Sequence, residues 1–114
     1  MKVISIKLLF ICSRNKWRSL TAEKVFEQFS MYQVRSAGTE ENARIKVTSG
    51  HIGWADLIFV METKHTRRLK EKFGSSLTGK RIIRLDIPDD YPFMDEELIE
   101  ILKARVSEYI EVPD

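Results

Sequence analysis

Two hydrophobic patterns alternate along this chain of 114 residues. Continuous aliphatic runs are typical of strands buried on both faces of a parallel sheet, and they predict strands at 3–11 and 56–61. Two further segments, at 32–38 and 81–87, are also predicted to be strands. Between these runs, apolar residues recur every three or four positions, as in amphipathic helices. This spacing predicts helices at 19–29, 63–73 and 94–110, and Gly74 ends the second of them.

The order strand–helix–strand–short helix–strand–helix–strand–helix indicates an α/β protein with a single domain over residues 1–114. We expect a four-stranded parallel sheet with helices on both faces, because parallel strands need crossover connections. Ligands in such sheets bind beyond the carboxyl ends of the strands. The first of these ends is at Cys12, so we expect a ligand-binding loop between the first strand and the first helix.

Composition narrows the class of protein. The 19 basic and 17 acidic residues are interspersed and give a net charge of +2, which indicates neither a nucleic-acid partner nor a membrane partner. The apolar opening segment is interrupted by Lys7 and falls short of the ~20 residues that a membrane span needs. A single cysteine excludes a disulfide framework and fits a cytoplasmic protein. One cysteine and two distant histidines make a poor metal set, so we expect neither metal nor cofactor.

The single cysteine, Cys12, lies where a buried strand ends and stands six residues before Arg18. A loop there can turn its N–H groups toward an anion, the helix N-terminus adds a positive dipole end, and arginine matches two phosphate oxygens. The same features stabilise a thiolate, which is an in-line nucleophile at phosphorus. The pattern predicts a phosphate-binding loop between the first strand and the first helix, and it favours phosphate-ester hydrolysis through a phosphocysteine. Two further residues support this interpretation, because asparagine at position 15 tolerates left-handed backbone geometry and Ser19 is placed to donate to the sulfur. The alternative is that Cys12 is a small core residue, as lone cysteines often are.

The segment "CSRNKWRS" resembles the Cys-x-x-Asn-x-x-Arg-Ser loop of the low-molecular-weight protein tyrosine phosphatase family. "RSLTAEKVF" is similar to the first helix of that family, and "SAGT", "ADLIFVM" and "DIPDDYPF" are similar to its later motifs. The resemblance covers nearly the whole chain in order. Together, the loop and the helix are the most specific part of it.

The resemblance implies a role for each matching residue. Cys12 would be the nucleophile, Arg18 would hold the transferring phosphoryl group, and Asp89 would be the general acid. Asp86 and Asp90 stay open as alternatives for the acid. The resemblance also implies a phosphate cradle made by the N–H groups of Ser13, Arg14, Asn15, Lys16, Trp17 and Arg18, a supporting network of Asn15, Ser19 and Ser36, and a substrate slot lined by Tyr91 and Trp17.

The chain also departs from the family pattern. A further helix and loop of the family have no counterpart in this chain, where residue 40 is followed directly by residue 41 at that place. Arg14 replaces a glycine that many relatives have in the loop, and Trp17 replaces a cysteine that often precedes the arginine. Asp90 replaces the proline of the acid loop, and Glu41 replaces a histidine. We expect these changes to affect the catalytic rate and the choice of substrate more than the fold.

Two functions follow from these observations. The first is phosphomonoester hydrolysis, as a protein tyrosine phosphatase; the alternative is a phosphate- or phosphoprotein-binding regulatory module with little or no turnover. The expected partner is a phosphorylated protein or a small phosphate ester, with inorganic phosphate, sulfate or vanadate as site ligands. Phosphotyrosine, phosphoarginine and small esters all remain open as substrates. A cysteine–histidine protease using His51 or His65 has no supporting motif.

Overall fold

The computed structural model describes residues 5–113, and over this range strands and helices alternate along the chain. None of the helices in this range is long and apolar enough to cross a membrane. In chain order the elements are β1 (Ile6–Cys12), α1 (Arg18–Phe26), β2 (Tyr32–Gly38), α2 (Ser49–Trp54), β3 (Leu57–Val60), α3 (Thr63–Phe73), the 3-10 turn η1 (Gly74–Leu77), β4 (Arg81–Arg84) and α4 (Glu96–Val106).

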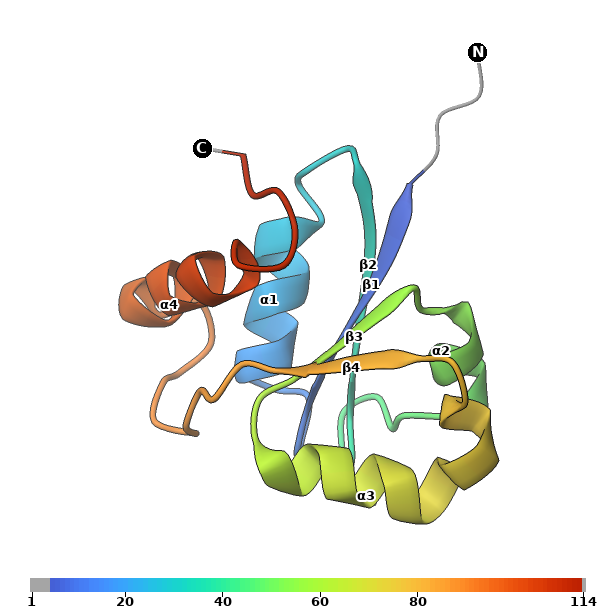
Figure 1. Cartoon of the computed structure of the whole chain (residues 1–114). Coiled ribbons are helices and arrows are strands. Elements are labelled where there is room, and N and C mark those ends of the chain that lie inside the picture. Colours follow the sequence, from blue (N-terminus) through green and yellow to red (C-terminus); the bar gives the residue numbers. More distant parts are fainter. Residues whose placement is uncertain (1–4, 114) are drawn as a thin grey trace.

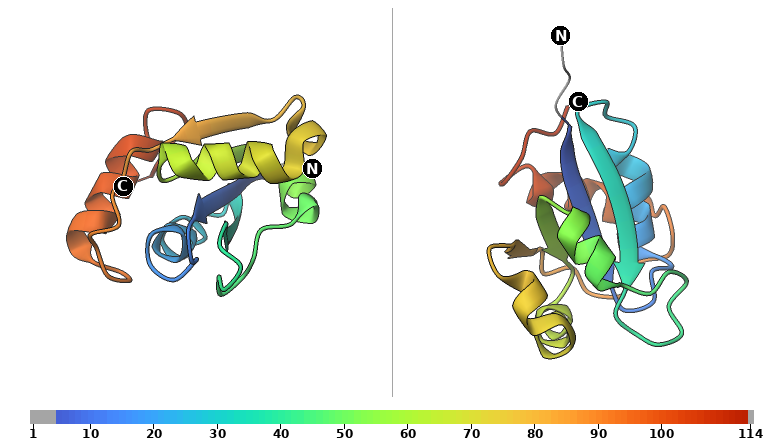
Figure 2. Two further views of the ribbon diagram at one scale, coloured as in Figure 1. Left: turned by 90° about the horizontal axis from the view of Figure 1, so that it is seen from below. Right: turned by 90° about the vertical axis from the view of Figure 1, so that its right-hand side faces the viewer.

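The four described strands form one parallel sheet in the order β2-β1-β3-β4 (Figure 1). β1 and β2 pair along their whole length, from Ile6 opposite Tyr32 to Cys12 opposite Gly38. Figure 2 shows the two strands side by side in its right-hand view. The chain then returns past β1 to place β3 on its other side, so the winding reverses at β1. The predicted α/β fold is confirmed, and Cys12 lies at the carboxyl end where ligands bind in such sheets.

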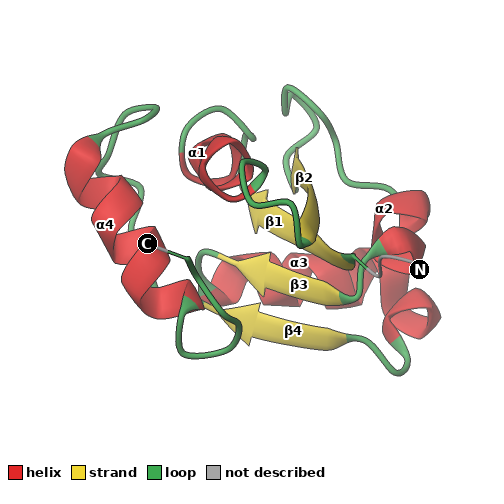
Figure 3. Ribbon diagram, turned by 90° about the horizontal axis from the view of Figure 1, so that it is seen from above, coloured by secondary structure: helices red, strands yellow, loops and turns green. Residues whose placement is uncertain are grey.

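Alternate residues of β1 belong to different hydrophobic layers. Leu8, Phe10 and Cys12 join a buried cluster with α1 and α4, whereas Leu9 and Ile11 join a second cluster with α2 and α3. Helices therefore cover both faces of the sheet (Figure 3). This double burial explains why the strand appears in the sequence as a continuous apolar run instead of an alternating one.

Several helix ends differ from the predicted ones, because apolar periodicity does not show at which residue a helix begins or ends. α4 begins at Glu96 instead of residue 94, because Met94 has a φ of 61° and Asp95 caps the helix by accepting the N–H of Leu98 at 3.1 Å. α1 ends at Phe26 instead of residue 29, and α4 ends at Val106 instead of residue 110. The first predicted strand begins at residue 3, but residues 3 and 4 lie outside the described range.

The fourth strand ends three residues earlier than predicted, because Asp86 has a φ of 55°. The N–H groups of Leu85 and Ile87 nevertheless donate to the carbonyls of Val60 and Met61, both at 2.9 Å. These bonds keep the segment beside the end of β3. The chain thereby carries residues 88–90 to the same edge of the sheet as Cys12.

Candidate active site

The loop between β1 and α1, residues 13–17, is held in place through its carbonyl groups. The N–H of Thr39 donates to the carbonyl of Cys12 at 3.0 Å, and the N–H of Arg44 donates to the carbonyl of Arg14 at 2.9 Å. Within the described part of the chain, no N–H of residues 13–17 donates to a protein acceptor. The loop therefore has the free N–H groups that an anion-binding nest requires.

The close approach of β2 to this loop requires a glycine at its end. A Cβ atom on Gly38 would lie 2.6 Å from the carbonyl oxygen of Ser13 and 2.6 Å from the Cβ of Ala43. Real Cβ contacts are longer than this, so a larger residue would push the loop away. Gly38 therefore allows the segment after β2 to support the loop directly.

A chain of side-chain hydrogen bonds leads from the loop to the sulfur. Asn15 is buried with a φ of 58°, a left-handed conformation that asparagine tolerates better than most residues. Its Nδ2 donates to Ser19 Oγ at 2.8 Å, and Ser19 Oγ lies 2.9 Å from Cys12 Sγ. Because the serine oxygen already accepts from Asn15, its own hydrogen can be donated to the sulfur. Ser19 is therefore placed to donate a hydrogen bond to Cys12 Sγ.

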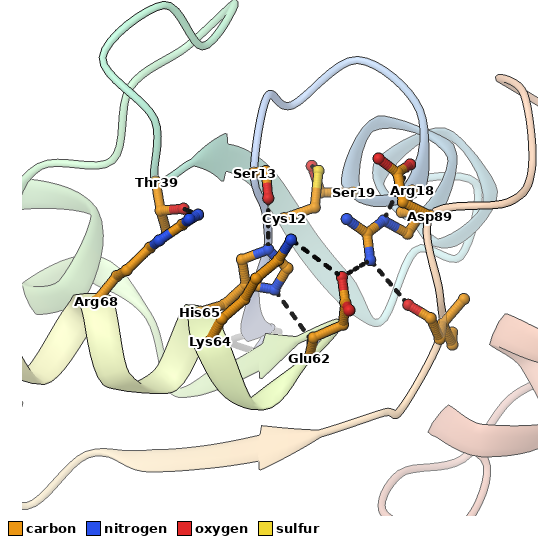
Figure 4. A network of polar contacts seen from close by, with 11 residues as sticks. Cys12, Ser13, Arg18, Ser19, Thr39, Glu62, Lys64, His65, Arg68 and Asp89 are labelled. Carbon is orange, nitrogen blue, oxygen red and sulfur yellow. Dashed lines mark hydrogen bonds and ion pairs between the residues drawn. The ribbon is translucent and has the colours of Figure 1, made fainter.

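Arg18 is almost completely buried, with 1% of its surface exposed, and its guanidinium is held from one side (Figure 4). Its Nη1 donates to Glu62 Oε2 at 2.5 Å and to the carbonyl of Ile87 at 2.8 Å. Its Nε lies 3.6 Å from Asp89 Oδ1 and has no hydrogen-bond partner in residues 5–113. A buried donor without a partner is costly, so the Nε is suited to a ligand oxygen.

Glu62 follows β3 and forms the carboxylate side of this ion pair. Burial by itself raises the pKa of Glu62, but the hydrogen bond and charge of Arg18, together with the charges of Lys64 and His65, lower it below its ordinary value. Lys64 Nζ lies 3.8 Å from the same carboxylate oxygen. The ionised carboxylate therefore fixes the orientation of Arg18 from the side of α3.

His65 connects the start of α3 to the loop. Its Nε2 lies 2.9 Å from Ser13 Oγ, and its Nδ1 accepts the backbone N–H of Glu62 at 3.1 Å. The side chain is fully buried. Burial and the positive charge of Arg18 lower the pKa of His65 from 6.5 to about 3, against an opposing effect of Glu62, so the ring is neutral near pH 7.

A cavity of about 310 Å³ lies next to these residues, at the carboxyl edge of the sheet. Positive side chains outnumber negative ones in its wall, which favours an anionic ligand. Within residues 5–113, no group of three or more His, Cys, Asp or Glu side chains is arranged to hold a metal ion. The cavity is lined by Cys12, Ser13, Arg14, Lys16, Trp17, Arg18, Glu40, Lys64 and Asp89.

The three candidate acids occupy different environments. Asp89 lines the cavity beside Arg18. Asp86 instead pairs with Arg84, with 2.6 Å between its Oδ1 and the arginine Nε, and lines a separate hollow on the surface. Asp90 is exposed and is not part of the cavity wall. The geometry therefore favours Asp89 as the carboxylate that can reach a bound ligand.

Four residues that the resemblance assigned to the site are not among those that line the cavity: Asn15, Ser19, Ser36 and Tyr91. The hydroxyl of Ser36 donates to Glu23 Oε1 at 2.6 Å instead of to the loop asparagine. Asn15 Oδ1 has no hydrogen-bond partner in the described range. Tyr91 packs against the core cluster that α1 and α4 share, so Trp17 is the aromatic side chain of the cavity wall.

Sequence reasoning missed the contribution of the segment after β3. Glu62 pairs with Arg18, His65 contacts the loop and Lys64 lines the cavity, yet all three lie more than forty residues from Arg18 in the chain. A usable signal was present, because Glu62 directly follows a buried parallel strand and the carboxyl ends of such strands meet at one edge. Glu40 lines the cavity from the segment after β2, and its position after a parallel strand could have indicated this in the same way.

No family model matches the chain, and a search of curated proteins also finds no match. Solved structures do match. Wzb from Vibrio vulnificus, in complex with benzylphosphonate, is 21% identical with a TM-score of 0.72, over 92% of this chain and 97% of that one. The low-molecular-weight protein tyrosine phosphatase of T. tengcongensis is 19% identical with a TM-score of 0.72, over 93% and 100% of the two chains.

A third match is the YwlE arginine phosphatase from Geobacillus stearothermophilus, which is 20% identical with a TM-score of 0.60, over 90% of this chain and 84% of that one. At this level of identity the comparison establishes the fold. The chain therefore has the fold of the low-molecular-weight protein tyrosine phosphatases, as its sequence motifs indicated.

Proposed function

We propose that this protein hydrolyses phosphomonoesters through a phosphocysteine formed on Cys12. The observation that carries the proposal is the pairing of a nucleophile and a free donor in one cavity. Cys12 and Arg18 both line it, and the buried Nε of Arg18 has no hydrogen-bond partner within the described chain. A phosphoryl oxygen is a suitable acceptor for that donor, and it would bring phosphorus to the sulfur.

Binding would use the backbone and the basic side chains together. The free N–H groups of residues 13–17 surround the position of an anion, and the N-terminus of α1 adds its positive dipole end. Lys64 and Arg14 contribute further positive charge from the cavity wall. Arg18 is held rigidly by Glu62, so its guanidinium needs little reorganisation when the phosphoryl group arrives.

Hydrolysis then takes two displacements at phosphorus. In the first, the thiolate of Cys12 forms an S–P bond while the bond to the leaving oxygen breaks, and Asp89 gives that oxygen a proton. In the second, Asp89 takes a proton from water as the water attacks phosphorus, and the S–P bond breaks to release inorganic phosphate and the thiolate. Asp89 is suited to both steps because it lies at the cavity beside Arg18.

We propose a phosphorylated protein, with phosphotyrosine as the modified residue, as the substrate. Trp17 is 48% exposed at the cavity wall, where its ring can stack on a substrate ring. The Vibrio vulnificus structure contains benzylphosphonate, a ligand that carries an aromatic ring beside its phosphonate. A nucleophile that must stay reduced, in a chain with no second cysteine, fits a cytoplasmic location.

The first experiment is hydrolysis of p-nitrophenyl phosphate by the wild type and by a Cys12→Ser variant. We expect turnover by the wild type and none by the variant, while both still bind inorganic phosphate. Release of phosphate from peptides that carry phosphotyrosine, phosphoarginine or phosphoserine then identifies the substrate class. Phosphate binding without turnover by the wild type would support the regulatory module instead. Equal turnover by the wild type and the variant would exclude Cys12 as the nucleophile.

A further inference from the structure

We propose that the hydroxyl of Ser13 is a side-chain donor to the bound phosphoryl group, and that His65 positions it for this purpose. The inference rests on the proposed phosphate site and adds a contact that the loop backbone does not supply. Ser13 lines the cavity together with Cys12, and only 6% of its surface is exposed. Its hydroxyl has one described partner, the imidazole of His65.

The contacts of His65 determine which ring nitrogen carries the proton. Nδ1 lies 3.1 Å from the backbone nitrogen of Glu62 and accepts its N–H, so Nδ1 is unprotonated. The ring is neutral near pH 7, because burial and the charge of Arg18 hold the pKa of His65 at about 3. The single ring proton is therefore on Nε2, and it is donated to Ser13 Oγ over 2.9 Å.

This tautomer leaves the hydroxyl hydrogen of Ser13 available. The serine oxygen accepts from His65, so its own O–H is not used in that bond, and no other protein acceptor lies within hydrogen-bond distance in the described structure. Since the residue lines the cavity, the hydrogen can be donated to a non-bridging phosphoryl oxygen. Hydrogen bonds to charged oxygens are about twice as strong as neutral ones, so the contact should contribute measurably to binding.

The same geometry excludes a serine–histidine hydrolase at this position. A general base needs an unprotonated Nε2 that accepts the serine proton. Here the N–H of Glu62 selects the opposite tautomer, in which Nε2 is a donor. His65 therefore positions the hydroxyl of Ser13 and does not activate it, and Cys12 remains the nucleophile.

Calorimetric titration with inorganic phosphate tests the serine directly. Ser13→Ala should weaken phosphate binding by about tenfold to a hundredfold, which is the usual effect of losing a hydrogen bond to a charged group. Ser13→Thr keeps the hydroxyl and should restore most of the affinity. Thermal unfolding of each variant checks that the fold is unchanged.

Two substitutions of His65 separate positioning from structural support. His65→Asn keeps an acceptor near the place of Nδ1 for the N–H of Glu62 but has no donor that reaches Ser13, so phosphate binding should weaken as in Ser13→Ala. His65→Gln keeps a donor near the place of Nε2 and should restore binding. His51 makes the same contact with a backbone N–H, that of Thr48, far from the loop, so His51→Asn is the matched control and should bind phosphate like the wild type.

Nitrogen-15 NMR of the imidazole provides a readout that does not depend on phosphate binding. It should show a neutral His65 ring with its proton on Nε2 at pH 7. A proton on Nδ1, or Ser13→Ala that binds phosphate as tightly as the wild type, would overturn the inference while leaving the proposed hydrolysis intact. Equal affinity losses in His65→Asn and His65→Gln would overturn the positioning role. A wild type that neither binds phosphate nor hydrolyses p-nitrophenyl phosphate would overturn both proposals.

Discussion

Asp89 Oδ1 lies 3.6 Å from Arg18 Nε, the donor that has no hydrogen-bond partner in the described structure. The two residues come from different connections, one after β4 and one at the start of α1. The carboxylate partly neutralises the buried guanidinium. A bound phosphoryl group would take over that role, which leaves Asp89 at the cavity to handle the proton of the leaving group.

The first prediction concerns this carboxylate. Asp89→Asn should lower kcat for phenyl phosphate by about 10²–10⁴-fold, because phenolate is a poor leaving group that needs a proton. The loss for p-nitrophenyl phosphate should be much smaller. Affinity for inorganic phosphate should not fall, since the substitution removes a negative charge beside Arg18. Asp90→Asn and Asp86→Asn are the matched controls, and the leaving-group signature in either of them would identify a different acid.

The second prediction concerns the geometry of the guanidinium. Arg18→Lys keeps the positive charge but removes the planar fork, and it breaks the contacts with Glu62 and the carbonyl of Ile87. We expect kcat to fall by about 10²-fold or more. Steady-state kinetics with p-nitrophenyl phosphate measures this loss. A rate within threefold of the wild type would show that Arg18 does not contact the transferring group.

The third prediction concerns the pH dependence of stability. His65 has a pKa of about 3 in the folded protein and 6.5 as its ordinary value, so between these pH values only the unfolded chain takes up the proton. Stability should therefore be full above pH 6.5 and fall as the pH decreases, by up to about 1.4 kcal/mol per pH unit. The charged groups around the ring are Arg18, Glu62, Lys64 and Arg68.

Urea unfolding of the wild type and of His65→Gln between pH 7 and pH 5 measures this dependence. The variant should lose the part of the slope that His65 contributes. Glu62 also has a lowered pKa, but its contribution is lost only below its ordinary value of 4.5, outside this range. His51, whose pKa is lowered by burial and by Arg35, is present in both proteins and cancels. Parallel curves for the two proteins would contradict the prediction.

The fourth prediction concerns the support of the loop. Gly38→Ala places a Cβ 2.6 Å from the carbonyl oxygen of Ser13, so we expect a loss of about 1–3 kcal/mol in the free energy of unfolding and a larger loss of activity. Gly53→Ala in α2 is the matched control, because its Cβ meets no atom within 4 Å. The control should be neutral or slightly stabilising, since alanine favours the helix. Equal effects of the two substitutions on activity would contradict the prediction.

Much of the fold could be predicted because it follows from local patterns. The predicted bounds of β2 and α3 match the structure, and Gly74 ends α3 as expected. Two of the failures are at single residues with special conformations. Asp86 and Met94 have positive φ values, which end β4 early and delay α4, and apolar periodicity contains no information about such residues.

The sequence by itself determined which polar side chains one loop brings together, because Cys12, Asn15, Arg18 and Ser19 lie within eight consecutive positions between a strand and a helix. A short segment can have only a few conformations between those two elements, so spacing alone predicts their approach. Only the tertiary structure decided what surrounds the loop. Glu62 and His65 reach Arg18 and Ser13 because parallel pairing aligns the end of β3 with the end of β1. The tertiary structure also turned Ser36 toward Glu23 and placed Asp89, not Asp86, beside Arg18, since both outcomes depend on side-chain packing between distant segments.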